Sequence, residues 1–265
     1  MSESSATKPS DSVPSVIAQG QGWLVLDKPA GQSFHSEDGV PGFFAAAEAA
    51  LGQKLWPVHR LDKVTSGLVL VATSAESAAF LSQQFAERAT RKYYLALSRQ
   101  RPKKKQGIIK GDMGKARNGS YRLLRTLDNP AITRFWSRLD TSFGERLFLL
   151  KPHTGKTHQL RVAMKSLGAP IFGDTRYGGD EADRTYLHAW ALEFNDGQAQ
   201  QRDGERVAAR RHGDRQRAEP HTPGADQHRA DGRPPCPHDY CWHSWKNAAQ
   251  ISNDRAAYMR RARAA

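Results

Sequence analysis

The sequence predicts an α+β fold with a mixed, largely antiparallel central sheet and flanking helices and loops. Three observations lead to this prediction. Residues 119–127, 131–139 and 146–151 have the pattern of three successive strands with no helix between them. Helical patterns are few elsewhere, so repeated strand–helix–strand units are not expected. The 265 residues are enough for one catalytic domain of good size.

The first part of the chain supplies a polar segment, a strand and a short helix. Residues 1–21 are rich in Ser and other polar groups, and we expect them to be a disordered leader. Residues 23–27 are an apolar strand, and residues 28–31 turn the chain through Pro and Gly. The Ala-rich residues 43–51 predict a helix that ends at Gly52.

The next segment joins a polar loop to the most apolar strand. Residues 58–67 read Val-His-Arg-Leu-Asp-Lys-Val-Thr-Ser-Gly, and the aliphatic residues 68–71 follow as a buried strand. Asp62 therefore lies on a loop just before a core strand, with Arg60 and Lys63 as nearby cations. Charged groups are rarely buried without a partner, so Asp62 is a candidate for a carboxylate that stays ionised and is held in place by a nearby cation. For a lone Asp, a backbone-capped turn residue is the simpler interpretation.

The middle of the chain contains a helix, a strand and a basic loop. Ser74 is the expected N-cap of a helix that runs to about Ala89. Residues 91–97 follow as a strand with two adjacent tyrosines, which β-propensity alone would explain. Residues 101–105 are a basic loop that either contacts phosphate groups or is a solvated turn.

The last regular elements are a helix and a closing strand. Thr157 is the expected N-cap of a helix that runs to Leu167, which places Arg161 about one turn inside it. Residues 187–194 follow as the closing strand. The sequence therefore predicts one folded domain over residues 22–196.

Residues 197–265 differ in composition from this domain. Residues 201–265 contain no Leu and no Phe, and their 13 Lys and Arg outnumber 8 Asp and Glu. Such a segment buries too little apolar surface to offset the ordering of its backbone. We expect an Arg-rich tail that is disordered or the product of a frameshift, which resequencing the gene would settle. A zinc site at Cys236 and Cys241 is conceivable, but chance composition is the simpler interpretation, and no metal is expected.

Charge and hydropathy limit the possible partners. The net charge is +13 and the isoelectric point is about 10.0, which suits a polyanion such as RNA but also fits a generic basic protein. No apolar run approaches the ~20 residues of a membrane span, and the N-terminus lacks the apolar core of a signal peptide. We therefore expect no membrane contact and a cytoplasmic location.

The Asp62 loop resembles the catalytic motif of the RluA-type pseudouridine synthases, within the RluA/RsuA superfamily. His59-Arg60-Leu61-Asp62 and Thr65-Ser66-Gly67 match the family signature at every fixed position. Further matching stretches are residues 28–31, Lys92 with Tyr94, residues 151–161, residues 168–178 and residues 187–194. The chain departs at Lys156, where the family has Arg, and at Ala163, where it has a second His. We expect no S4-type RNA-binding domain, because the leader is too short to hold the one that some relatives carry. We also expect that the further strand with which the family continues after the closing strand is missing.

The resemblance implies the pseudouridine synthase catalytic fold and an isomerase that needs no cofactor. The reaction breaks the uridine N1–C1′ bond, turns the base and rejoins it through C5. Asp62 attacks C1′ or assists proton loss from C2′, and Arg161 is its ion-pair partner. Tyr94 stacks against the target base and is a candidate for relaying the C5 proton. Arg60 is a candidate for filling the space that the flipped base leaves.

The resemblance also implies a set of substrate-binding residues and an RNA partner. These residues are Arg60, His59, Thr65, Lys92, Lys156 and His158. Relatives without the S4 domain act on tRNA, ribosomal RNA or both, and a monomer is the default expectation. The alternatives are a catalytically impaired RNA-binding or RNA-folding protein on the same scaffold, or an unstable gene product.

Overall fold

The computed structural model describes residues 14–140, 145–197 and 207–210. The strands are β1 (Ser15–Gly20), β2 (Trp23–Lys28), β3 (Trp56–Pro57), β4 (Ser66–Ala72), β5 (Arg91–Ser98), β6 (Gln106–Gly111), β7 (Met113–Lys115), β8 (Tyr121–Leu123), β9 (Ala131–Asp140), β10 (Glu145–Pro152), β11 (Leu187–Phe194) and β12 (Val207–Arg210). The helices are α1 (Phe43–Leu51), α2 (Ala75–Ala86) and α3 (Gln159–Ser166), and two 3₁₀ turns are η1 (Arg117–Gly119) and η2 (Thr175–Tyr177).

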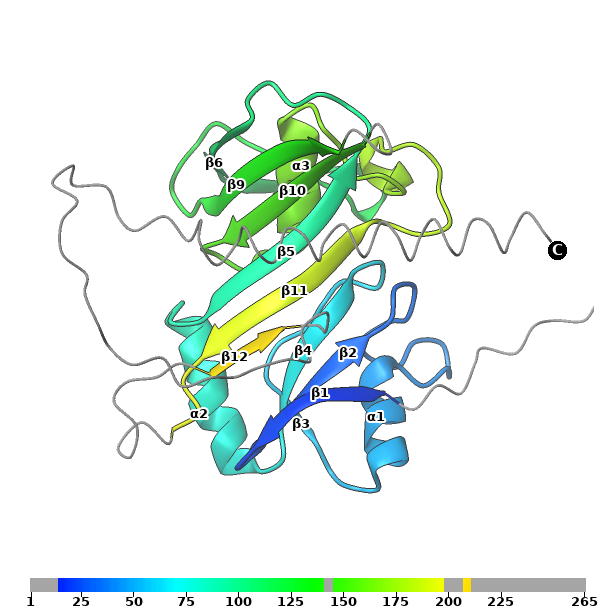
Figure 1. Cartoon of the computed structure of the whole chain (residues 1–265), viewed down its shortest axis with the longest axis vertical. Helices are drawn as coiled ribbons and strands as arrows, with labels where there is room; N and C mark the ends of the chain where they lie inside the picture. The colour runs from blue at the N-terminus through cyan, green and yellow to red at the C-terminus, as the bar shows by residue number, and fades with distance from the viewer. Residues whose placement is uncertain (1–13, 141–144, 198–206, 211–265) are drawn as a thin grey trace, which may run out of the picture. The chain divides into compact units, whose positions relative to one another are not determined.

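One sheet organises the described part of the chain. Its strand order is β1-β2-β4-β11-β5-β10-β9-β6, with β3 also paired to β4 and β12 to β11 (Figure 1). The β4–β11 pair is parallel, and the other pairs described in this sheet are antiparallel. The prediction of an α+β fold with a mixed, largely antiparallel sheet is therefore confirmed.

The β4–β11–β5 register sets the position of the functional site. Ala189 of β11 is opposite Gly67 of β4 on one side and Tyr94 of β5 on the other. Gly67 has φ 109°, and a Cβ at this position would lie 2.2 Å from the Ala189 carbonyl oxygen. Only glycine combines this backbone conformation with so close an approach. The Asp62 loop, which leads into β4, is thereby brought next to Tyr94.

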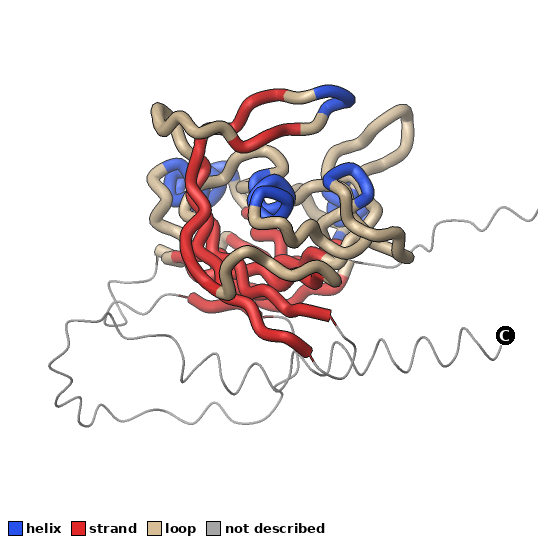
Figure 2. The backbone as a smooth tube through the Cα atoms, turned by 90° about the horizontal axis from the view of Figure 1, so that it is seen from above, coloured by secondary structure: helices blue, strands red, loops and turns tan. Residues whose placement is uncertain are grey.

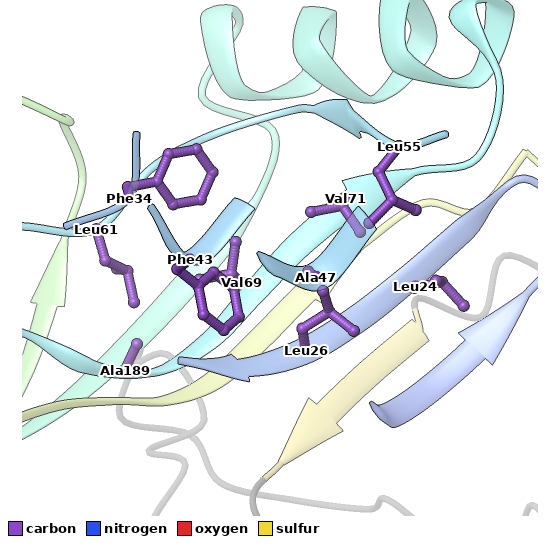
Figure 3. Close-up of a cluster of buried hydrophobic side chains, with 10 residues drawn as sticks. All are labelled: Leu24, Leu26, Phe34, Phe43, Ala47, Leu55, Leu61, Val69, Val71 and Ala189. Atoms are coloured by element: carbon purple, nitrogen blue, oxygen red, sulfur yellow. The ribbon is translucent and has the colours of Figure 1, made fainter. Parts of the chain in front are cut away.

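Alternate residues of β2 and β4 feed two apolar clusters, as expected for a strand pair buried on both faces. The first cluster joins these strands to α1 and to Leu61 beside Asp62 (Figure 3). Its buried members are Leu24, Leu26, Phe34, Phe43, Ala47, Leu55, Leu61, Val69, Val71 and Ala189. The second cluster includes Leu68, Leu70 and Leu81 of α2. A third cluster joins α3 to β5, β10 and β11, and Tyr94 packs against both it and the first.

Two of the three expected helix caps are correct, and α2 ends at Ala86, three residues before the expected end at about Ala89. The Ser74 side chain accepts a hydrogen bond from the Ser77 amide at 3.1 Å and so caps α2. Gly52 ends α1 in the left-handed conformation. The prediction that Thr157 caps the third helix is wrong, because α3 begins at Gln159 and its N-cap position is His158, which is left-handed with φ 56° and makes no side-chain cap.

The structure corrects the two ends of the predicted domain. Residues 15–20 are not a disordered leader, because β1 pairs with β2 along most of its length. The statement that no further strand follows the closing strand is also wrong, because β12 pairs with the second half of β11. The remainder of the predicted tail, including Cys236 and Cys241, and the proposed frameshift lie outside the described residues.

A small hairpin stands apart from the main sheet. Strands β7 and β8 pair with each other and not with the ten-stranded sheet. The strand expected over residues 119–127 is thus limited to Tyr121–Leu123. Figure 2 shows this hairpin beyond the helices, on the side away from the main sheet, and β8 contacts α3. In the described ranges, no helix is both long and apolar enough to cross a bilayer.

Candidate active site

A cavity of about 600 Å³ opens where the Asp62 loop, β5 and the loop before α3 meet. This volume is in the range of small-ligand sites. All the residues that the sequence assigns to the site line it: His59, Arg60, Asp62, Thr65, Lys92, Tyr94, Lys156, His158 and Arg161. The structure therefore brings together residues from three separate motifs, while their individual roles stay predictions.

Asp62 is the one carboxylate among the described residues that line the cavity. Its side chain is 23% exposed, so one edge remains open to the cavity. The Asp62 carbonyl accepts a hydrogen bond from the Thr65 amide at 2.9 Å, which closes a tight turn. Leu61 is buried in the first apolar cluster and anchors this turn from below. The carboxylate is thus presented by a loop that is fixed at both ends.

Lys28, at the end of β2, holds the same loop through its side chain. Its ammonium group is fully buried and donates hydrogen bonds to the carbonyl oxygens of Pro29, Lys63 and Thr65 at 2.9, 3.2 and 3.0 Å. The Gly31 amide adds a hydrogen bond to the Lys63 carbonyl at 2.9 Å. Burial lowers the pKa of Lys28 to about 8, although the Asp62 carboxylate opposes this effect. The Lys-Pro-x-Gly stretch is therefore a support for the Asp62 loop, a role that the sequence alone does not indicate.

Replacing Lys28 with Met should loosen the Asp62 loop and change how the free energy of unfolding depends on pH. Because Lys28 titrates near 10.4 in an unfolded chain and near 8 in the folded one, the unfolded chain binds more protons between these values. The contribution of Lys28 to the free energy of unfolding therefore rises with pH from about 8 to about 10. Urea unfolding of the wild type and Lys28→Met should show a larger rise of stability with pH in the wild type, because buried lysines such as Lys92 contribute to the rise in both proteins.

The same variant should also speed hydrogen exchange of the Gly31 and Thr65 amides, because the carbonyls that order the loop lose their shared donor. Lys110→Met, at an exposed position on β6, is the matched control. Unchanged exchange at both amides in Lys28→Met, or an identical pH dependence in wild type and variant, would contradict the assigned support.

Arg161, in the first turn of α3, is shared by two carboxylates. Its Nε and Nη2 donate to the two oxygens of Asp174 at 2.8 and 2.7 Å, in a bidentate pair that is almost fully buried. Its Nη1 lies 3.9 Å from the nearer oxygen of Asp62. Arg161 therefore faces Asp62 as the sequence predicts, but its main partner is Asp174. The sequence motifs alone assign no role to Asp174, although it falls within a matching stretch.

Arg161 keeps its positive charge although its side chain is buried. Burial alone would lower its pKa, but hydrogen bonds and charge from Asp174, together with the Asp62 carboxylate, outweigh this effect and raise the pKa. The guanidinium also lies over the Tyr177 ring, 4.8 Å from its centroid. A permanent cation is thus held beside Asp62 by groups that lie behind it.

Tyr94 contributes an aromatic ring and a protonated hydroxyl. It projects from β5 between two apolar clusters and lines the cavity with Asp62. Burial raises its pKa above the ordinary value, and the Asp62 carboxylate raises it further. Tyr94 is therefore a neutral phenol at neutral pH. It offers a flat face for stacking and an O–H group for proton transfer.

His59 connects the Asp62 loop to the framework. Its Nε2 accepts a hydrogen bond from the Leu70 amide at 3.0 Å, and its ring stacks on Phe85 at 4.5 Å. Burial, with Lys92 nearby, lowers the pKa of His59 to about 3, so the imidazole is neutral. The Lys92 ammonium group lies over the Phe85 ring, 5.1 Å from its centroid. Burial lowers the pKa of Lys92 as well. His59 thus forms part of the cavity wall through contacts to α2 and β4.

The loop before α3 is fixed by a buried polar network. Thr154 donates to the Gln159 side-chain oxygen at 2.7 Å and accepts from the Ile132 amide at 2.9 Å. The Gln159 amide group donates to Ile132 and Thr133, and its oxygen also accepts from the Lys156 amide. Because each of these groups is paired, the loop is held to β9 in a single arrangement. Lys156 and His158 reach the cavity from this loop.

The cavity is strongly basic. Of its described lining residues, Arg60, Arg88, Lys92, Lys156 and Arg161 are cations. Arg88 was not expected from the sequence. It follows α2 in the left-handed conformation with φ 59°, which is uncommon for a residue with a side chain. A cavity with one carboxylate among these cations suits a negatively charged substrate that reacts at the carboxylate.

The chain is similar in sequence to known RNA pseudouridine synthases. The sequence model of a family described as RNA pseudouridylate synthase matches residues 22–166. A Haemophilus influenzae protein described as an uncharacterized RNA pseudouridine synthase is 54% identical over 183 residues, which cover 68% of this chain and 81% of the relative. Ribosomal large subunit pseudouridine synthase D of Borreliella burgdorferi is 34% identical over 209 residues, which cover 72% of this chain and 64% of that relative.

Coverage is smaller for another curated relative, and solved structures share the fold. Ribosomal large subunit pseudouridine synthase C of Rickettsia bellii is 40% identical over 141 residues, so this chain spans 46% of that relative's length. The human protein RNA pseudouridylate synthase domain containing 1 superposes with a TM-score of 0.62 at 25% identity, covering 77% of this chain and 85% of the human one. The human protein RNA pseudouridylate synthase domain containing 4 superposes with a TM-score of 0.57 at 22% identity, covering 74% of this chain and 87% of the human one. This second similarity shows the fold alone.

Proposed function

Because the chain belongs to the RNA pseudouridylate synthase family of RNA isomerases, we propose that it converts specific uridines of tRNA, ribosomal RNA or both to pseudouridine, with Asp62 as the catalytic carboxylate. The observation that carries this proposal is the place of Asp62. It is the one carboxylate among the described lining residues of a cationic cavity, 3.9 Å from a buried guanidinium. The proposed reaction breaks N1–C1′, turns the base, joins C5 to C1′ and releases the C5 proton.

The geometry of Arg161 supports an active role for the carboxylate. Two nitrogens of Arg161 are bonded to Asp174, and the third lies beyond hydrogen-bond distance of Asp62. Arg161 therefore balances the charge of Asp62 without occupying its oxygens. In the proposed mechanism one of these oxygens attacks C1′ or takes a proton from C2′.

Tyr94 and Arg60 are proposed to handle the flipped base. Extruding a nucleotide from an RNA stack costs a few kcal/mol, which stacking in the pocket and filling the gap offset. Tyr94 offers the stacking face, and its retained proton makes its hydroxyl a candidate for the C5 proton relay. Arg60 is exposed at the edge of the cavity, where it could enter the vacated space.

The other cations are proposed to bind phosphates. Lys92, Lys156 and Arg88 line the cavity beside Asp62. Each phosphate contact adds a salt-dependent contribution to affinity that does not depend on base identity. His59 and Thr65 would shape the wall against which the nucleotide packs. The proposed binding should therefore weaken steeply as the salt concentration rises.

The class of RNA is the open choice within this proposal. Two relatives are named for the ribosomal large subunit, which makes ribosomal RNA one candidate, and tRNA is the other. Monomeric state, cytoplasmic location and a reaction without cofactor stay predictions from the sequence.

Tritium release tests the proposed function. Bulk tRNA and ribosomal RNA, labelled with tritium at C5 of uridine, would be prepared from cells that lack this gene. We expect wild-type protein to release tritium from at least one of the two pools, and that pool identifies the substrate class. A protein that unfolds cooperatively on heating but releases no tritium from either pool would overturn the proposal and favour the RNA-binding alternative.

A further inference from the structure

His158 has an unusual backbone and a closely packed side chain. It precedes α3 with φ 56° and ψ 17°, a left-handed conformation that residues with side chains seldom adopt. Its imidazole packs edge-on against Tyr121 of β8 and Tyr177 of η2, with ring centroids 5.6 and 5.7 Å apart. It is half-buried and lines the cavity. Such strain is retained where the surroundings fix a particular orientation.

A short hydrogen-bond chain fixes the protonation pattern of His158. The Tyr121 amide donates to the Tyr177 hydroxyl oxygen at 3.0 Å, and the same oxygen lies 2.8 Å from His158 Nδ1. These are the partners recorded for this hydroxyl within the described residues, and Tyr177 is 1% exposed. If Nδ1 carried a proton, the Tyr177 oxygen would accept twice and its own buried hydrogen would have no acceptor, which is costly.

The arrangement in which the Tyr177 hydroxyl hydrogen has an acceptor determines which nitrogen of His158 carries its hydrogen. The Tyr177 O–H donates to Nδ1, so a neutral His158 carries its hydrogen on Nε2. Burial lowers the pKa of His158, with Arg161 and Arg176 acting in the same direction, while the Asp62 and Asp174 carboxylates oppose them. The nitrogen that remains available to the cavity is thus an N–H donor.

We propose that Tyr177 is a positioning residue that fixes His158 so that its Nε2–H donates a hydrogen bond to a carbonyl oxygen of the target uracil. This inference rests on the proposed function. When N1–C1′ breaks, the bond electrons go to the base, and the negative charge spreads over N1, O2 and O4. A donor that is already oriented binds this anion more strongly than the intact nucleotide and so lowers the barrier to cleavage. The charge disappears again when C5 bonds to C1′.

Steady-state kinetics of four variants test the proposal on the RNA pool that wild type modifies. His158→Ala should lower kcat by about 10- to 100-fold with KM changed by less than about threefold, because the lost bond is strongest in the transition state. His158→Gln places an amide N–H near the Nε2 position and should recover part of kcat. Tyr177→Phe should lower kcat by about 3- to 10-fold in the wild type and have no further effect when combined with His158→Ala.

The controls separate this role from packing and from phosphate binding. Tyr186→Phe removes a tyrosine hydroxyl that donates to Asp183, away from the cavity, and should leave kcat unchanged. Thermal unfolding should show that each variant is folded at the assay temperature. An equal effect of Tyr177→Phe with and without His158 would overturn the positioning role. A raised KM with normal kcat in His158→Ala would indicate a phosphate contact and overturn the uracil assignment. Absence of tritium release by wild type would overturn the proposed function and this inference together.

Discussion

Replacing Asp62 with Asn should reduce tritium release by at least about 10³-fold. Asn keeps the shape of the side chain but can neither attack C1′ nor accept a proton from C2′. Because Arg161 is held by Asp174 and not by Asp62, the cavity should keep its form in this variant. RNA affinity in a filter-binding assay should be unchanged or slightly tighter, since a negative charge leaves a cationic cavity.

Glu76→Gln is the matched control for Asp62→Asn, because it neutralises one exposed carboxylate in the first turn of α2, outside the cavity. It should leave both tritium release and RNA affinity unchanged. Retention of more than about a tenth of the wild-type rate by Asp62→Asn would show that this carboxylate is not the catalytic group. Loss of rate together with loss of RNA binding would point to a binding role.

Replacing Asp174 with Asn should both destabilise the protein and abolish its activity. Asp174 and Arg161 are 1% and 6% exposed in their side chains, so removing the carboxylate leaves a buried guanidinium with only the more distant Asp62. Breaking a buried pair in this way typically lowers the free energy of unfolding by about 3–5 kcal/mol. We also expect Arg161 to move toward Asp62 and occupy the oxygens that the reaction needs. Urea unfolding and tritium release measure the two effects.

A double variant separates stability from catalysis at this pair. Asp174→Leu combined with Arg161→Met replaces both ions with apolar groups and should recover much of the lost stability while activity stays absent. Glu193→Gln is the control, because its pair with Arg91 is partly exposed and is expected to contribute at most about 1 kcal/mol. Full activity in Asp174→Asn would show that Asp62 does not depend on this support.

Local sequence patterns predicted the elements that depend on local physics. The strands at residues 23–27 and 68–71 are close to β2 and β4, because continuous apolar runs of this length bury themselves in a sheet. The strand at residues 91–97 is close to β5, because its adjacent tyrosines favour a strand. The Ser74 cap was predictable because its hydrogen bond spans only three residues. The Thr157 cap failed because the left-handed backbone of His158 is fixed by contacts to Tyr121 and Tyr177, and neither residue is a sequence neighbour.

Pairing with distant strands also changed the predicted ends of the domain. Residues 15–20 have a weak and half-exposed pattern, and β2 provides the hydrogen bonds that make them a strand. Residues 207–210 likewise form β12 through backbone pairing with β11. Composition describes how much apolar surface a segment can bury, but an edge strand needs little of it once a neighbouring strand supplies the ladder.

The sequence by itself indicated the kind of chemistry, because the motifs that contain Asp62, Tyr94 and Arg161 resemble those of the family, while the catalytic roles of these residues stay predictions. Only the tertiary structure decided how these residues are held. The Lys63 and Thr65 carbonyls on Lys28, the bidentate Asp174 behind Arg161 and the Tyr121–Tyr177–His158 chain all join residues that are not sequence neighbours. The physical reason is that a buried ion or hydroxyl takes whichever partner the fold brings within hydrogen-bond distance, and residue type at one position does not specify that partner.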